Sequence, residues 1–231
     1  MNPAPDIEAM KREAAVRAVA AVEDGMVLGL GSGSTTAHAV AALASRIAGG
    51  LHVACVATSR RTAALARRHG VPLTDFAAHR RLDLAIDGAD QVETGTLDLV
   101  KGLGGALLRE KIVACASRRF YVIVDETKLV ARLGARTPVP VEIVRFGWET
   151  VIDRLAALGC APSLRAAGDA PFVTENGNYI ADCAFAAIDA AAALEARIAA
   201  IAGVVESGLF VGLASRAYVG RPHGVEVIER R

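Results

Sequence analysis

Residues 100–111, which read VKGLGGALLREK, combine a lysine, three glycines and a carboxylate that together could bind an anion and move a proton. The glycines let a ligand approach backbone N–H groups, because no Cβ stands in the way. The N-terminus of the helix expected next favours an anion. Lys101 adds a positive charge, and Glu110 is a candidate base. A plainer alternative is a glycine turn followed by a surface ion pair of Glu110 with Arg109 or Lys111.

A second segment, GLGSGST at 29–35, combines glycines with hydroxyl side chains. Its backbone N–H groups and the hydroxyls of Ser32, Ser34 and Thr35 could cradle a phosphate. A tight strand-to-helix turn with a Ser/Thr cap is the alternative. No lysine precedes Ser34, so this is not a Walker loop. Its glycines also depart from the dinucleotide-binding pattern, which needs its third glycine at position 34.

A third segment places two carboxylates, Asp87 and Asp90, around Gly88 and Ala89 directly after an apolar stretch. These carboxylates could hold sugar hydroxyls, assist proton transfer or bind a metal. A turn with Asp caps explains the same residues. Two carboxylates alone give little support for a magnesium site.

Alternating strands and helices are expected to position these segments. The pattern predicts a parallel sheet that is covered on both faces. All three segments then fall at the carboxyl ends of successive strands, where open α/β sheets bind ligands. Strands are expected at 26–30, 52–57, 82–86, 97–101 and 120–124, and helices at 7–22, 36–47, 59–69 and 106–116.

A smaller βαββαβ module of the ferredoxin-like kind is expected after residue 132. Its two middle strands are expected to be joined by a hairpin turn at 175–178, which reads ENGN. The fold class is therefore α/β, a Rossmann-like open parallel sheet with a smaller ferredoxin-like α+β domain. The predicted domains are 1–131 plus 207–231, and 132–206. The sheet face with Val139, Val141 and Ile143 is expected to pair with another subunit, or else to be covered by the module's own helices.

Composition narrows the classes of protein. The chain has 231 residues, of which 53% are hydrophobic and 22% charged, which is typical of a globular protein. A net charge of +1 and only 4% aromatic residues argue against nucleic acid and anionic membrane surfaces as partners. The four cysteines form no CxxC pair, and no apolar segment is long enough to span a bilayer. We therefore expect a soluble cytoplasmic protein.

Taken together, the three segments make the chain resemble ribose-5-phosphate isomerases of the A type. The similarity continues through DETK (125–128), PVPVEI (138–143), TENGNYIAD (174–182) and GVVESGLF (203–210), and so covers nearly the whole chain. It implies interconversion of ribose 5-phosphate and ribulose 5-phosphate through a cis-enediolate, with no cofactor and no metal. It also implies a homodimer or homotetramer. Leu103 stands where the family usually has glycine, and Gln91 where it often has Glu.

The resemblance also implies roles for individual residues. Glu110 is expected to be the general base, and Lys101 is expected to stabilise the enediolate. Asp87 and Asp90 suit ring opening and the movement of hydroxyl protons. The substrate is expected to contact Ser32, Gly33, Ser34, Thr35, Asp87, Gly88, Ala89, Asp90, Lys101, Gly102, Leu103, Gly104, Glu110 and Lys128.

Two other classes of function remain open at this point. A non-catalytic sugar-phosphate sensor would have no need of Glu110 and would normally carry a DNA-binding segment, yet no spare basic helix-turn-helix is evident. The second class is a related enzyme, such as an amino-sugar phosphate deaminase or a CoA transferase. The deaminase needs a catalytic histidine, and no histidine lies near the three segments.

Overall fold

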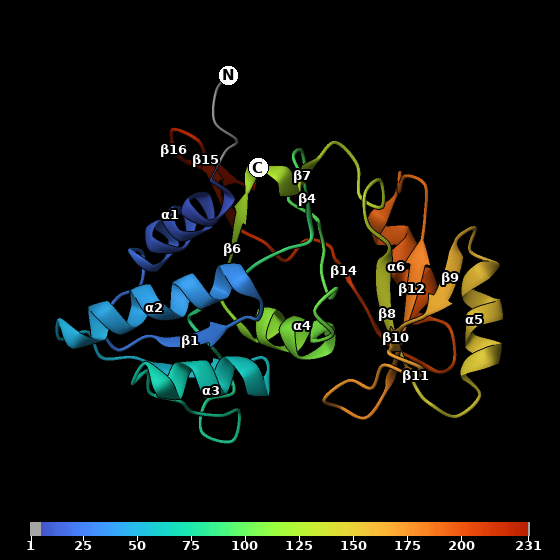
Figure 1. Cartoon of the computed structure of the whole chain (residues 1–231), viewed down its shortest axis with the longest axis horizontal. Helices are drawn as coiled ribbons and strands as arrows, with labels where there is room; N and C mark the ends of the chain where they lie inside the picture. Colours follow the sequence, from blue (N-terminus) through green and yellow to red (C-terminus); the bar gives the residue numbers. More distant parts are fainter. Residues whose placement is uncertain (1–5, 231) are drawn as a thin grey trace.

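The computed structural model describes residues 6–230, which form a larger and a smaller lobe (Figure 1). The larger lobe is built on a six-stranded sheet with the order β16-β15-β6-β3-β1-β2. Its strands run parallel except β16, which pairs antiparallel with β15 at the edge. These strands are β1 (Val27–Leu30), β2 (Ala54–Ala57), β3 (Leu84–Asp87), β6 (Phe120–Asp125), β15 (Arg216–Arg221) and β16 (Gly224–Glu229). The predicted parallel sheet is confirmed.

Helices cover both faces of this sheet, because alternate apolar residues of its strands point to opposite sides. On one face Leu28, Leu30 and Ile86 share a core with α1 and α2. On the other face Ala85 and Val122 pack with α4. The helices are α1 (Ile7–Val19), α2 (Ser34–Ala48), α3 (Arg60–Arg68) and α4 (Leu107–Ala116), close to the predicted ranges. Among the helices of residues 6–230, none is long and apolar enough to cross a membrane.

The predicted strand at 97–101 does not join the parallel sheet. It is the short strand β5 (Leu99–Val100), which lies in a separate four-stranded sheet with the order β14-β5-β4-β7. The other strands of that sheet are β4 (Gln91–Glu93), β7 (Leu129–Val130) and β14 (Leu209–Phe210). Only residues 94–98 separate β4 from β5, which is too short for the crossover that a parallel neighbour needs. Lys101 therefore reaches the site from a different sheet than Asp87.

The smaller lobe has the predicted βαββαβ order. Its sheet has the order β13-β8-β12-β9, and every neighbouring pair is antiparallel. The elements are β8 (Val139–Ile143), α5 (Trp148–Ala156), β9 (Ala161–Leu164), β12 (Tyr179–Ala184), α6 (Ala191–Ala199) and β13 (Val204–Ser207). Val139, Val141 and Ile143 are fully buried in a core with residues of α5 and α6. The alternative of a face covered by the lobe's own helices is therefore correct, and pairing of that face with another subunit is wrong.

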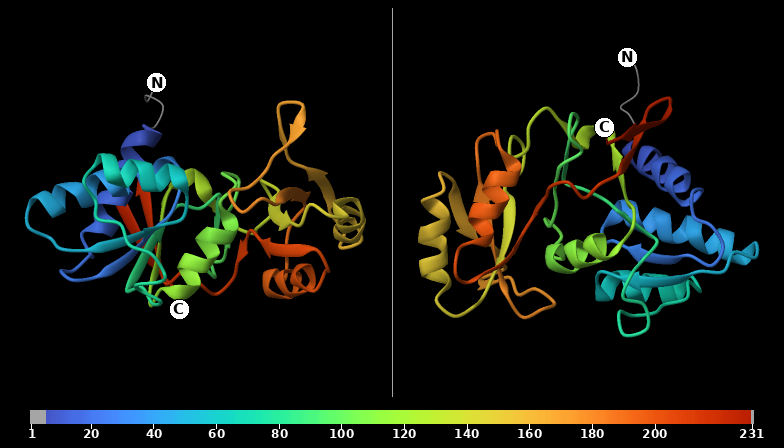
Figure 2. Two further views of the ribbon diagram at one scale, coloured as in Figure 1. Left: turned by 90° about the horizontal axis from the view of Figure 1, so that it is seen from below. Right: turned by 180° about the vertical axis from the view of Figure 1, so that it is seen from behind.

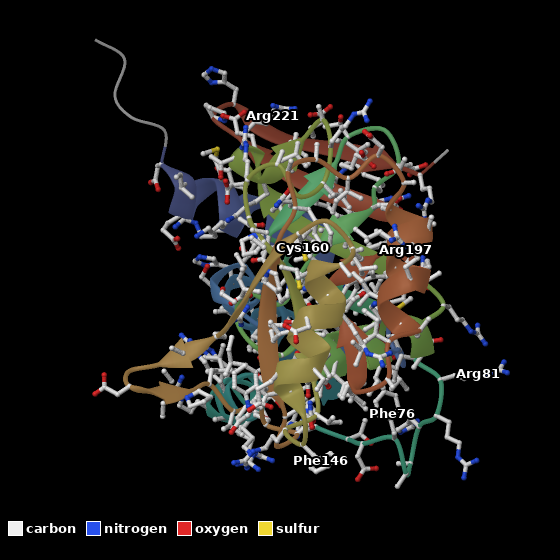
Figure 3. All side chains as sticks on the ribbon, turned by 90° about the vertical axis from the view of Figure 1, so that its right-hand side faces the viewer. Phe76, Arg81, Phe146, Cys160, Arg197 and Arg221 are labelled. Carbon is white, nitrogen blue, oxygen red and sulfur yellow. The ribbon has the colours of Figure 1, made fainter. Side chains whose placement is uncertain are left out.

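An arm that the sequence analysis did not predict interrupts the connection between β9 and β12. Its two short strands, β10 (Ala166–Ala167) and β11 (Ala170–Pro171), pair antiparallel around Gly168, which has φ +65°. The arm projects from the body of the lobe (Figures 2 and 3). The predicted turn follows it, and Gly177 N–H donates to the carbonyl of Thr174 at 3.0 Å. The tail returns to the larger lobe as β14, β15 and β16, as predicted.

Candidate active site

The three predicted segments meet around a cavity of about 180 Å³. Its walls come from residues 32–35 at the start of α2, residues 88–90 after β3, and residues 101–110. Lys128 of the short 3-10 helix η1 (Glu126–Lys128) also lines it. Every predicted substrate-contacting residue lies on this wall except Asp87 and Leu103. Within residues 6–230, no group of three or more His, Cys, Asp or Glu side chains is arranged to hold a metal ion.

Glu110 lies in the first turn of α4 and is only 5% exposed. Its Oε1 accepts a hydrogen bond from the hydroxyl of Ser32. Its Oε2 lies 3.3 Å from Lys101 Nζ and accepts no hydrogen bond from the described residues. One oxygen of this carboxylate is thus held by Ser32, while the other is buried beside the Lys101 ammonium group, and the residue forms part of the cavity wall.

The neighbours of Glu110 in the sequence are paired with other acids. Arg109 forms an ion pair with Glu175 of the smaller lobe. Lys111 is buried and forms ion pairs with Glu195 at 2.8 Å and Glu206 at 2.7 Å. The alternative of a surface ion pair between Glu110 and either neighbour is therefore excluded.

Lys101 lies between the two carboxylates at the base of the cavity. Its Nζ donates to the carbonyl of Gly88 at 2.6 Å and lies 2.9 Å from Asp87 Oδ2. Burial by itself would lower the pKa of Lys101, but the charges of Asp87 and Glu110 outweigh it and raise this pKa above its usual value. Lys101 therefore remains a cation in the wall of the cavity, beside the two carboxylates.

Asp87 lies behind the cavity wall and holds the start of the loop at residues 32–35 in place. Its Oδ1 accepts from the backbone N–H groups of Ser32 at 3.0 Å and Gly88 at 2.7 Å. A Cβ at position 31 would lie 1.9 Å from the Asp87 carboxyl group, so glycine is required there. Burial raises the pKa of Asp87 to about 7; the charge of Lys101 opposes this shift and that of Glu110 adds to it.

The raised pKa of Asp87 predicts a pH-dependent stability. The folded chain holds this proton up to about pH 7, whereas an unfolded aspartate releases it near about pH 4. Ionisation thus costs folding free energy that is absent below about pH 4 and complete above about pH 7. We expect the free energy of unfolding of the native protein to fall over this range relative to Asp87→Asn. Urea unfolding of both proteins measures the difference, and a difference that is constant with pH contradicts the raised pKa.

The glycine-rich turn accommodates Leu103 because this residue contacts Asp90 through its backbone. Burial raises the pKa of Asp90, and its Oδ2 accepts a hydrogen bond from the Leu103 N–H at 2.9 Å, which opposes the rise. The Leu103 side chain is 40% exposed and is not part of the cavity wall. Only the backbone of Leu103 is used in the site, so the leucine side chain does not crowd it.

The loop at 32–35 presents the N-terminus of α2 to the cavity. Gly33 is the residue before the helix and has φ +97°, a conformation that favours glycine. Lys11 of α1, which sequence reasoning missed, also lines the cavity, and its Nζ lies 3.2 Å from Ser34 Oγ. Nothing local in the sequence marks Lys11, because only the packing of α1 against α2 brings it here. With Lys101 and Lys128, it gives the cavity wall three cations suited to an anionic ligand.

Comparisons with known proteins agree on one family. The family model for ribose 5-phosphate isomerase A (phosphoriboisomerase A) matches residues 54–224. A curated relative from Gloeobacter violaceus, named ribose-5-phosphate isomerase A, is 53% identical over 223 residues, which are 96% of this chain and 97% of the relative. A solved ribose 5-phosphate isomerase A from Methanocaldococcus jannaschii superposes with a TM-score of 0.93 at 40% identity, covering 96% of this chain and 99% of that one.

A second solved structure adds a ligand. It is described as a D-ribose-5-phosphate isomerase in complex with phospho-erythronic acid, and it superposes with a TM-score of 0.95 at 38% identity. The match covers 97% of this chain and all of the other. From the family model, the curated relatives and the shared fold, the chain belongs to the ribose 5-phosphate isomerase A family.

Proposed function

We propose that the chain interconverts ribose 5-phosphate and ribulose 5-phosphate, with Glu110 as the base that moves the proton. The observation that carries this mechanism is the Glu110 carboxylate. One of its oxygens is fixed by Ser32, the other lies 3.3 Å from Lys101 Nζ, and the residue lines a cavity whose wall also holds three lysines. Membership of the isomerase family supports the substrate pair.

The substrate phosphate binds at the loop of residues 32–35. The N-terminus of α2 supplies backbone N–H groups and a favourable dipole, and the hydroxyls of Ser32, Ser34 and Thr35 lie on the same wall. Lys11 adds a positive charge beside Ser34. Anchoring the phosphate fixes the rest of the sugar, so that binding energy remote from the reacting carbons serves the reaction.

Isomerisation then needs one base and a stabilised oxygen anion. Glu110 removes the proton from C2 of the open-chain aldose, which forms a cis-enediolate, and returns a proton to C1. A single carboxylate above the plane shared by C1 and C2 can serve both carbons. Lys101 lies 3.3 Å from Glu110 Oε2 and stabilises the charge that develops on the substrate oxygens.

Ring opening and proton transfers between the hydroxyls are assigned to Asp90, and Asp87 supports the site from behind the cavity wall. Asp90 lines the cavity, where its carboxyl group can reach substrate hydroxyls, and burial raises its pKa above the usual value for an aspartate. Asp87 is not on the wall, so it acts through Lys101 and through the loop that it holds. This division of labour goes beyond what the sequence could separate.

Activity and mechanism are tested together by assaying ribose 5-phosphate in deuterated water. We expect ribulose 5-phosphate to form, with solvent deuterium incorporated at the carbon that receives the proton. Isomerisation without any deuterium incorporation contradicts a base that exchanges with solvent, and no isomerisation at all contradicts the proposed activity. No histidine is among the residues that line this cavity, so nothing in it favours a histidine-dependent deaminase.

We infer a homodimer or homotetramer that acts in the cytoplasm, with a boundary between the two lobes near residues 131–132 and 206–207. The return of the chain from β13 to β14 after Ser207 supports the second boundary. Sedimentation of the purified protein measures the subunit number.

A further inference from the structure

Arg165 of the smaller lobe reaches across to the glycine turn that lines the cavity. It follows β9 at the base of the arm, and its side chain is only 13% exposed. One guanidinium nitrogen, Nη1, donates to the carbonyls of Gly102 and Leu103, each at 3.0 Å. The guanidinium is itself held by Asp182 of β12, whose Oδ2 accepts from Nε at 2.8 Å and whose Oδ1 accepts from Nη2. Arg165 therefore fixes the turn from outside the cavity.

The peptide between Gly102 and Leu103 is fixed at both ends. Its carbonyl accepts from Arg165, while its N–H donates to Asp90 Oδ2 at 2.9 Å. The next peptide, between Leu103 and Gly104, is fixed at one end only, because its carbonyl also accepts from Arg165. In a trans peptide the C=O and the N–H point in opposite directions. Holding that carbonyl outside therefore sets the direction of the Gly104 N–H.

The Gly104 N–H donates to no acceptor within residues 6–230, and Gly104 lines the cavity beside Lys101 and Glu110. A backbone donor without a partner at such a place is suited to a ligand oxygen. The arm adds steric support, since a Cβ on Gly105 would lie 2.6 Å from the Phe172 ring. The Arg165 guanidinium also lies 5.8 Å from the centre of that ring. The turn is thus packed against the smaller lobe as well as hydrogen-bonded to it.

We propose that Arg165, oriented by Asp182, is a positioning residue that directs the Gly104 N–H at the oxygens of the reacting C1–C2 end of the substrate. The inference rests on the proposed isomerase function and gives the smaller lobe a part in it. An arginine suits this place because its planar fork serves two carbonyls and one carboxylate together, whereas a lysine is a single point donor. Arg165 touches no reacting atom, so its effect passes through the turn.

The test compares Arg165→Ala and Arg165→Lys with the native protein and with Arg216→Ala. Arg216 is a matched control because it also pairs with an acid, Glu229, and stacks on aromatic rings, but it lies at the opposite end of the parallel strands. We expect kcat of Arg165→Ala to fall about 100-fold, the size of effect that a misplacement of about 1 Å produces. Arg216→Ala keeps the native kcat.

Inorganic phosphate as a competitive inhibitor separates positioning from general damage. It binds at residues 32–35, so its inhibition constant is expected to change less than about threefold in Arg165→Ala while kcat falls. Arg165→Lys is expected to recover less than a tenth of the lost kcat, because one donor cannot replace the fork. Asp182→Asn, which keeps the arginine but weakens its orientation, is expected to lower kcat about 10-fold.

Two results overturn the inference. One is a kcat of Arg165→Ala within threefold of native. The other is a parallel loss of phosphate inhibition and of thermal stability, because a merely structural role predicts both. If Arg165→Ala does not fold, kcat, phosphate inhibition and thermal stability are compared for Arg165→Lys and Asp182→Asn instead, and the same two results overturn the inference. Absence of activity in the native protein and in Arg216→Ala contradicts the proposed function itself, and is therefore distinguishable from failure of the positioning role.

Discussion

Glu110→Gln is expected to lower kcat by about 1000-fold or more while binding of ribose 5-phosphate stays within a few-fold of native. General base catalysis contributes on the order of 100- to 10,000-fold, and a carboxamide cannot accept the proton. The substitution keeps the size of the side chain, and the amide oxygen still accepts from the Ser32 hydroxyl. Steady-state rates and titration calorimetry with ribose 5-phosphate measure the two quantities.

Glu13→Gln is the matched control for this prediction, because Glu13 is an exposed carboxylate on α1 outside the cavity wall. We expect it to keep native rates. Native turnover in Glu110→Gln excludes Glu110 as the base. A loss of binding as large as the loss of rate shows instead that the carboxylate mainly holds the substrate.

Lys101→Met is expected to lower kcat by about 100- to 1000-fold, the typical loss when one donor to a developing oxyanion is removed. It also leaves Asp87 and Glu110 buried near each other without the cation that lies 2.9 and 3.3 Å from them. The free energy of unfolding is expected to fall by about 3 kcal/mol at neutral pH, because uncompensated buried charges are costly. Enzyme assays and urea unfolding test the two effects.

Lys111→Met separates the two effects of that change. Lys111 is also a buried lysine between two carboxylates, Glu195 and Glu206, but it does not line the cavity. We expect it to lose stability as Lys101→Met does, while its kcat stays within a few-fold of native. If both variants lose the same activity, the loss reports disturbed packing and not a missing oxyanion donor.

The sequence predicts the site residues correctly where they directly follow strands of the parallel sheet. The loop at 32–35 follows β1 and the segment at 87–90 follows β3, and these parallel neighbours bring both segments to the same sheet edge. Lys101 lies in the cavity wall, as predicted, but the strand that precedes it, β5, belongs to the second sheet and not to the parallel sheet. Placing the ligand site at the carboxyl ends of strands therefore predicted the position of Lys101 correctly, although its strand was expected in the parallel sheet.

The residues that sequence analysis missed depend on contacts between distant segments. Lys11 faces the cavity only because α1 packs on α2, and Arg165 meets residues 102–103 only because the smaller lobe approaches α4. Neither residue belongs to a local motif. The arm at 166–171 has no clear sequence signal, because its alanine-rich strands are only two residues long. Leu103, which stands where the family usually has glycine, is accommodated because it is 40% exposed and lies off the cavity wall, which periodicity does not show.

We expect Glu110 to lie over C1 and C2 of a sugar whose phosphate is held at residues 32–35. A crystal structure of Glu110→Gln with ribose 5-phosphate tests this most directly. We expect the side-chain oxygen or nitrogen of residue 110 to lie about 3–3.5 Å from both carbons, the reach that proton transfer requires, with the phosphate on the N–H groups of the loop. A sugar bound in the reverse direction, or outside this cavity, would contradict it.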